Sequence, residues 1–228
     1  SFCLFTGILS QYSVFAYGVP SDWAAEEVEE AVSNQLVPYS VKRDYQAYIT
    51  REQFCEMVVL AYEALSGETA AVGEEEFYDT DSDEVKKAAN LNIVEGYGSG
   101  IFDPTDLITR EQIAVMVVRM LDCAVPSVDI YDYSSHYYAD KYEISDWALP
   151  SVNFAYENDI MQGIGDYRIA PKLNTTCEQA VLLIYRTYAQ YISYDDGYDD
   201  IKYIDDDMYY TEPDDGCIDT ENEITFVD

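Results

Sequence analysis

The chain has 228 residues, of which 48% are hydrophobic, and its formal net charge at neutral pH is −33. This length and composition allow one or two domains with a sizeable buried core. The negative charge excludes nucleic acid as a partner, because phosphate binding requires a basic surface, and it excludes generic binding to an anionic membrane.

Residues 1–18 form an uncharged, mostly apolar segment with small residues at Ala16 and Gly18. This pattern predicts the remainder of a secretory signal whose basic start is missing. The segment is too short and too polar for a good membrane span, so no membrane insertion is expected once the signal is removed. The alternative interpretation is a hydrophobic strand or helix that packs on the following domain.

Three related units follow, over residues 20–67, 77–122 and 138–190. The tetrapeptide at 21–24, Ser-Asp-Trp-Ala, recurs at 145–148. The second and third units align without gaps at an offset of 67 residues. At that offset Gly96, Gly98, Phe102, Pro104 and Glu111 match Gly163, Gly165, Ile169, Pro171 and Glu178.

In each unit the sequence pattern predicts a helix, a loop and a second helix. The first helices are amphipathic and carry Trp23, Val85 and Trp147 near their starts. In all three units the second helix follows a Thr that has a Gln three residues later, a pairing typical of a capping box. One such pair of helices cannot bury its apolar face alone, so the sequence predicts an all-α protein in which three pairs pack together.

Arg51 and Arg110 occupy the first helical position after the repeated Thr. The unpaired N–H groups and the positive end of the helix dipole make this position unfavourable for a cation and favourable for an anion that lies against it. We therefore expect each arginine to meet an anionic ligand. Pairing of each arginine with a nearby Glu is the competing interpretation.

These features together resemble a triple S-layer homology (SLH) domain. The clearest copy runs from Ile93-Val94-Glu95-Gly96 through Phe102-Asp103-Pro104 to Ile108-Thr109-Arg110-Glu111, and the resemblance covers about residues 20–190. The family motif usually has Ala after the Arg and then Glu, whereas here Glu follows the Arg directly. The resemblance implies a pseudo-threefold bundle with the second helices inside and grooves between the units.

The resemblance also implies a secreted, non-catalytic anchor at the bacterial cell surface or S-layer, which binds secondary cell-wall polysaccharide that often carries pyruvate ketals. Arg51 and Arg110 would contact the anionic sugar substituent. The helix starts and the aromatic rings would complete the grooves, although packing in the core is the favoured role for the two Trp residues. The remaining glycan-binding candidates are Thr50, Thr109, Gly96, Gly98, Lys42, Arg43, Trp23 and Trp147.

Two units depart from the family pattern. The third has Cys177 where the Arg belongs, so its groove should lose a charge-assisted contact. The first lacks the Gly-rich loop, although Lys42 and Arg43 keep that segment basic. The alternative function is therefore a degenerate SLH bundle that serves as a structural or protein-interaction module without glycan binding.

No catalytic site, cofactor or metal site is predicted. The five cysteines form no CxxC pair, and the single histidine, His136, cannot build a histidine-based metal site or triad alone. Asp79 begins a stretch like a calcium loop, but Glu84 and Asn90 stand where an EF-hand needs Gly and Glu. The composition of residues 191–228, rich in Asp and Tyr, predicts an acidic irregular tail. A third functional hypothesis is a calcium-responsive acidic protein. The oligomeric state is not predicted.

Overall fold

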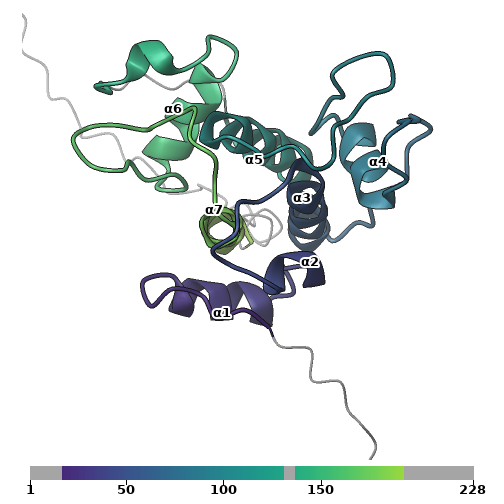
Figure 1. The fold of residues 1–228 in the computed structure, drawn as a ribbon, viewed down its shortest axis with the longest axis horizontal. Coiled ribbons are helices and arrows are strands. Elements are labelled where there is room, and N and C mark those ends of the chain that lie inside the picture. The colour runs from purple at the N-terminus through teal and green to yellow at the C-terminus, as the bar shows by residue number, and fades with distance from the viewer. Residues whose placement is uncertain (1–16, 131–136, 193–228) are drawn as a thin grey trace, which may run out of the picture. The chain divides into compact units, whose positions relative to one another are not determined.

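The computed structural model describes residues 17–130 and 137–192, which all lie within one structural unit. Most of the predicted signal and nearly all of the predicted tail lie outside these residues, as does His136. The described residues contain no β-sheet, and the predicted all-α class is confirmed (Figure 1). Their elements are α1 (Ala25–Ser33), α2 (Tyr39–Lys42), α3 (Arg51–Ser66), α4 (Asp83–Asn90), α5 (Arg110–Ala124), the 3₁₀ helix η1 (Lys141–Glu143), α6 (Leu149–Glu157) and α7 (Cys177–Tyr191).

The three long helices α3, α5 and α7 begin where the repeated Thr predicts. At the start of α3, Thr50 Oγ1 accepts a hydrogen bond from the Gln53 N–H at 3.3 Å, and Gln53 Oε1 accepts one from the Thr50 N–H at 3.0 Å. Thr176 and Gln179 exchange the same two bonds at the start of α7. These reciprocal bonds satisfy donors that the first turn of a helix leaves unpaired.

A ring of backbone hydrogen bonds joins the extended segments that precede these helices. The Ile49 N–H donates to the Thr175 carbonyl at 3.0 Å, and the Thr175 N–H donates to the Ile108 carbonyl at 3.1 Å. The Ile108 N–H closes the ring on the Ile49 carbonyl at 3.3 Å. Each segment therefore bonds to both of the others, and the three helix starts are held together at one end.

The first turn of each long helix is bonded to the segment before the next one. The N–H groups of Arg51 and Glu52 donate to the carbonyls of Asp106 and Pro104 at 2.9 and 3.1 Å. The corresponding groups of α5 donate to Leu173 and Pro171, and those of α7 donate to Ala47 and Tyr45. The same register occurs three times around the ring, so no long helix start leaves these N–H groups exposed.

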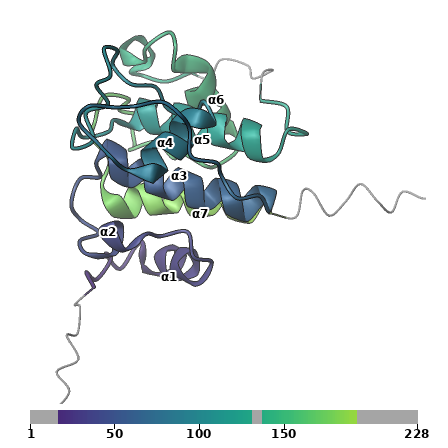
Figure 2. The ribbon, with the colours of Figure 1, turned by 90° about the vertical axis from the view of Figure 1, so that its right-hand side faces the viewer.

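Three shorter helices, α1, α4 and α6, each pack on a long helix from a different unit. Contacts between elements join α4 to α3, α6 to α5 and α1 to α7, while α3, α5 and α7 contact one another. Figures 1 and 2 show the long helices in the middle, with α1 beside α7 and running across it. The sequence analysis treated the two helices of each unit as a packed pair, and this pairing was wrong, because each of these shorter helices packs on a long helix of another unit.

Buried carboxylates anchor the starts of the outer segments. Glu178 accepts from the Ser21 N–H and hydroxyl at 3.0 and 2.9 Å, and Glu111 accepts the same pair of bonds from Ser145 at 3.0 and 3.1 Å. These carboxylates link α7 to the chain entering α1, and α5 to the chain entering α6. Within the described residues, no helix combines the length and the apolar character needed to cross a membrane.

Thr175 provides a test of the hydrogen-bonded ring. It is fully buried, and among the described residues its Oγ1 has no hydrogen-bond partner, whereas Ile49 and Ile108 occupy the corresponding positions. We expect Thr175→Val to raise the free energy of unfolding by about 1 kcal/mol, because it removes an unsatisfied buried hydroxyl. Denaturant titration measures this change.

The control is Thr187→Val, since the equally buried Thr187 hydroxyl donates to the Leu183 carbonyl at 2.8 Å. That variant should gain no stability. An equal gain in both variants would contradict the explanation.

Candidate functional site

Arg51 connects α3 to the glycine-rich loop of the next unit. Its side chain is only 6% exposed, and its Nε and Nη2 donate to the carbonyls of Phe102 and Glu95 at 3.1 and 3.0 Å. The guanidinium carbon lies 4.5 Å from the ring centre of Tyr97 and 4.7 Å from that of Phe102. The arginine therefore clamps both ends of this loop and stacks on two of its rings.

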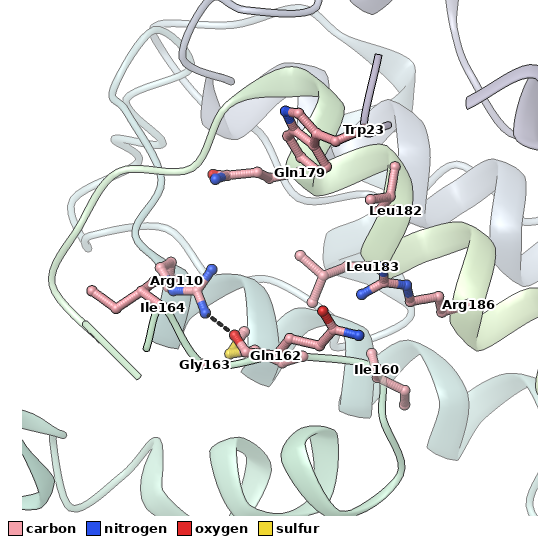
Figure 3. A pocket seen from close by; sticks show the side chains of 11 residues that line it. Trp23, Arg110, Ile160, Gln162, Gly163, Ile164, Gln179, Leu182, Leu183 and Arg186 are labelled. Carbon is pink, nitrogen blue, oxygen red and sulfur yellow. Dashed lines mark hydrogen bonds between the residues drawn. The ribbon is translucent and has the colours of Figure 1, made fainter. Parts of the chain in front are cut away.

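Arg110 has the same role one unit later. It is 7% exposed, and its Nε donates to the Ile169 carbonyl at 2.7 Å. Its Nη2 donates to the Gln162 carbonyl at 2.6 Å (Figure 3). Burial lowers the pKa of the guanidinium, and the negative charge of Asp140 partly opposes that shift. Arginine remains charged, so the lowered pKa indicates an incompletely solvated positive charge.

Two expectations about the arginines need correction. They are mostly buried by loop carbonyls rather than standing in open clefts, and neither forms an ion pair with a described residue. The neighbouring N–H groups are also unavailable to an anion, because they bond to the next segment of the backbone. Each arginine nevertheless lines a groove.

Two grooves contain these arginines. The Arg110 groove has a volume of about 410 Å³ and is bordered by residues 160–164, by Trp23 and by one side of α7 (Figure 3). The Arg51 groove has a volume of about 330 Å³ and is bordered by residues 93–95, by Trp147 and by one side of α5. Every residue that lines the Arg51 groove has its counterpart in the Arg110 groove, so the repeat has produced the same site twice.

Both Trp side chains are exposed, Trp23 by 60% and Trp147 by 58%. The preference for packing them in the core was therefore wrong. Each stands at the start of an outer helix, and each borders a groove whose arginine belongs to another unit. Every groove thus combines parts that are far apart in the sequence.

Sequence reasoning missed a second arginine in each groove. Arg119 and Arg186 lie on α5 and α7 at the offset of 67 residues that relates the glycine loops, and that spacing could have identified them. Arg186 makes two hydrogen bonds of 2.8 Å to the Glu27 carboxylate, while Arg119 lies 3.5 Å from Glu95. The acid that faces the second arginine therefore comes from α1 in one groove and from the loop in the other.

The other predicted residues support the grooves from outside. Thr50 and Thr109 cap their helices, and Gly96 and Gly98 line a separate pocket that shares Val94 and Glu95 with the Arg51 groove. A side chain at Gly96 would come within 2.7 Å of the Ile101 carbonyl oxygen, and Gly98 has a φ of +90°, so this loop requires both glycines.

Comparison with known protein families identifies two segments of the chain. The S-layer homology domain matches residues 78–114 and 137–181, which include both glycine loops and the start of α5 and α7. These two segments are S-layer homology domains. The match covers two segments, and the count of three SLH repeats remains a prediction.

Several bacterial proteins are similar to the chain. It is 27% identical over 77% of its length to an amylopullulanase of Thermoanaerobacterium thermosulfurigenes, of which it covers 10%. It is 35% identical over 44% of its length to an endoglucanase of Bacillus sp. strain KSM-635, of which it covers 11%. It is 31% identical over 54% of its length to the middle cell wall protein of Brevibacillus brevis, of which it covers 12%. The chain thus spans only about a tenth of these relatives.

SLH domains are non-catalytic modules that anchor cell-wall proteins, and the chain accordingly belongs to the cell surface.

The residues that would form a third groove differ from those of the other two grooves. Cys177 replaces the arginine and is almost fully buried, and burial raises the pKa of its thiol to about 11. In the first unit α2 replaces the glycine loop, and the Ser40 hydroxyl donates to Glu56 at 2.6 Å.

Lys42 and Arg43 end this short segment, and neither lines the Arg51 groove or the Arg110 groove. In the other units the arginine holds the glycine loop of the next unit. Cys177 stands in place of such an arginine, and the first unit, whose loop it would hold, has α2 instead of a glycine loop. Within the described parts of the chain, no cluster of three or more His, Cys, Asp or Glu residues is arranged to hold a metal ion.

The loop clamp can be tested by Arg51→Ala. We expect the free energy of unfolding to fall by about 3 kcal/mol, because two buried carbonyls lose a charged donor. Amide exchange in residues 95–102 should accelerate. The control is Arg119→Ala, whose partly exposed ion pair contributes less than about 1 kcal/mol. Equal losses in the two variants would contradict the clamp.

Asp79 provides a pH-dependent test of the same loop. Its carboxylate accepts from the N–H groups of Phe102 and Asp103 at 2.9 and 2.7 Å, and these bonds, chiefly the one from Phe102, lower its pKa. Since the folded pKa lies below that of the unfolded chain, the stabilisation is complete above the unfolded pKa of about 3.9 and is lost as pH falls through the folded value.

We therefore expect Asp79→Asn to be less stable than the original chain at neutral pH and to converge with it in acid. Unfolding titrations from pH 7 to pH 2 measure the difference. Asp81→Asn, at an exposed position nearby, is the control and should show no such convergence. A difference for Asp79→Asn that stays constant over this range would contradict the assignment.

Proposed function

We propose that the chain anchors its protein by binding secondary cell-wall polysaccharide in the Arg51 and Arg110 grooves. The observation that carries the proposal is the presence of two equivalent grooves, each with an exposed Trp at its edge and a buried arginine at its base. The Trp and the arginine of each groove are far apart in the sequence, and the cyclic packing of the helices brings them together. The role is one of attachment and requires no catalytic group.

The state of the arginines supports an anionic glycan. Nη1 of neither guanidinium has a hydrogen-bond partner among the described residues, and the bonded nitrogens meet only neutral carbonyls. Asp79 and Asp140 attract Arg51 and Arg110 respectively, but neither carboxylate forms an ion pair with its arginine. A carboxylate of the ligand, such as that of a pyruvate ketal, would add a directly bonded opposite charge in a partly desolvated place. This local attraction lets a strongly acidic chain retain an anionic polymer.

The remaining groups suit a sugar ring. Figure 3 shows the Trp23 ring, the Gln179 amide and the Arg110 guanidinium around the same opening. An aromatic ring can stack on the apolar face of a sugar, and the amide can bond to its hydroxyl groups. Trp147 and Gln112 provide the same groups in the Arg51 groove.

We also propose that the chain contains three SLH repeats, over residues 20–67, 77–122 and 138–190, in a pseudo-threefold bundle. The backbone ring at Ile49, Ile108 and Thr175 supports this arrangement, since the same bonds recur in cyclic order. Only two of the three positions between repeats retain an arginine, a Trp and a glycine loop.

The double variant Trp23→Ala/Trp147→Ala tests glycan binding without disturbing the core, because both rings are exposed. We expect binding to isolated cell-wall polysaccharide to weaken by at least about tenfold, since each groove loses its stacking surface. Calorimetry with the polymer, before and after removal of its acidic substituents, measures the change. Removal of those substituents should weaken binding by the original chain.

The control is Tyr142→Ala, which removes a fully exposed aromatic ring outside both grooves. Unchanged binding by the double variant, or equal binding to the polymer without its acidic groups, would contradict the proposal. The alternative is a bundle that has kept its packing and lost glycan binding, as Cys177 suggests for one position. A chain that binds no wall polymer but retains a protein partner would support that alternative.

A further inference from the structure

The second arginine is paired differently in the two grooves. Arg186 lines the Arg110 groove from α7 (Figure 3), and Arg119 lines the Arg51 groove from α5. The two residues correspond at the offset of 67 residues that relates the second and third units. What each of them contacts determines whether its positive charge is available to a ligand.

Arg186 is held firmly by an acid from another unit. Its Nε and Nη2 donate to the two carboxylate oxygens of Glu27 at 2.8 Å each, and the two side chains are only 24% and 31% exposed. A ligand carboxylate would have to displace two charge-assisted bonds and would be repelled by Glu27. Arg186 is therefore a positioning residue, which fixes α1 against α7 and with it the segment that carries Trp23.

Arg119 is held loosely. Its Nη1 lies 3.5 Å from the Glu95 carboxylate and 3.5 Å from the Ile93 carbonyl. The Arg119 side chain is 43% exposed and that of Glu95 is 78% exposed. An ion pair in this setting contributes little, because water screens both charges. Glu95 can turn into solvent, and Arg119 can then bond to a ligand without losing a strong contact.

One difference between the outer helices explains this contrast. The offset of 124 residues that relates Ser-Asp-Trp-Ala at 21–24 to its copy at 145–148 also relates α1 to α6 over their full lengths. At that offset Ser151 corresponds to Glu27. Helix α6 therefore has no carboxylate at the position from which α1 binds its arginine, and among the described residues the acid paired with Arg119 is the exposed Glu95.

The two arginines of the Arg51 groove meet at one short segment. Arg51 Nη2 donates to the Glu95 carbonyl at 3.0 Å, and Arg119 Nη1 donates to the Ile93 carbonyl. These carbonyls belong to the residues on either side of Val94, which also lines the groove. A ligand carboxylate beside Val94 would thus be attracted by two guanidinium groups in a partly desolvated place.

We infer that Arg119 binds the acidic group of the ligand together with Arg51, which makes the Arg51 groove the more charge-selective of the two sites. This inference rests on the proposed function. In the Arg110 groove Glu27 already neutralises the second arginine, so an acidic ligand gains from Arg110 alone. The Arg51 groove would hold an acidic sugar residue, whereas the Arg110 groove would bind acidic and neutral residues with more similar affinity.

Single-groove variants allow the two sites to be measured separately. Trp23→Ala leaves the Arg51 groove intact, and Trp147→Ala leaves the Arg110 groove intact. Calorimetry with short fragments of isolated wall polysaccharide, with and without their acidic substituents, gives the affinity of each site. We expect removal of the substituents to weaken binding by Trp23→Ala about tenfold more than binding by Trp147→Ala.

Ser151→Glu, added to Trp23→Ala, tests Arg119 directly. It supplies Arg119 with the partner that the other groove has, so affinity for the acidic fragment should fall about fivefold. Arg119→Gln in the same background should have a similar effect. The control is Ser151→Gln, which adds similar bulk without charge and should leave the affinity unchanged. None of these changes should alter binding of the fragment without acidic groups.

Glu27→Ser, added to Trp147→Ala, is the reciprocal exchange. It releases Arg186, so affinity for the acidic fragment should rise about threefold. The thermal midpoint is measured alongside, because the variant also loses a contact between α1 and α7. No rise in a variant that stays folded would contradict the role given to Glu27, and if the variant unfolds, Ser151→Glu decides the question.

The outcomes separate this inference from the proposed function. If the Trp23→Ala/Trp147→Ala variant loses binding while Ser151→Glu and Arg119→Gln change nothing, the inference fails and the proposed function stands. Equal weakening by Ser151→Glu and Ser151→Gln would also overturn the inference, because bulk would then explain the loss. If the original chain binds no fragment, both fail. If the Trp variants bind as the original chain does, the same substitutions in the original chain decide the role of Arg119, and only the role of the Trp rings fails.

Discussion

The arrangement of the molecule depends on the hydrogen-bonded ring between Ile49, Ile108 and Thr175. Through this ring each extended segment bonds to the other two, and each long helix starts against the segment that precedes the next. Backbone groups buried in this way must find partners, so the three segments are constrained as a set rather than in pairs. The helices that follow are consequently directed side by side, and their outer partners must come from other units.

The buried arginines connect the starts of α3 and α5 to the loops that border the grooves. Because Arg51 and Arg110 hold the next loop by its carbonyls, a groove forms where loop, long helix and outer helix meet. A guanidinium whose hydrogen bonds go only to neutral carbonyls can still form an ion pair with a ligand, whereas one already bonded to a carboxylate has less to gain. The same side chain can therefore fix the shape of the site and attract its ligand.

The three positions around the ring have diverged without loss of the ring itself. Cys177 keeps the backbone bond that Arg110 makes, but the loop opposite it has become a short helix. In the third unit, tyrosines line a pocket beside the glycine loop. Backbone bonds do not depend on side-chain identity, so the units could change their surfaces independently while the shared frame persisted.

Periodicity, the recurring Thr and Gln, and the glycine spacing were enough to predict an all-α protein, its helix starts and its family, because these are local properties of the chain. Which helices pack together was beyond that reasoning, since α1 and α7 meet across almost the whole domain. For the same reason the sequence suggested open arginines and buried Trp residues, whereas the tertiary structure buries the first and exposes the second. Local patterns determine where helices begin, but only long-range contacts decide which side chains face water.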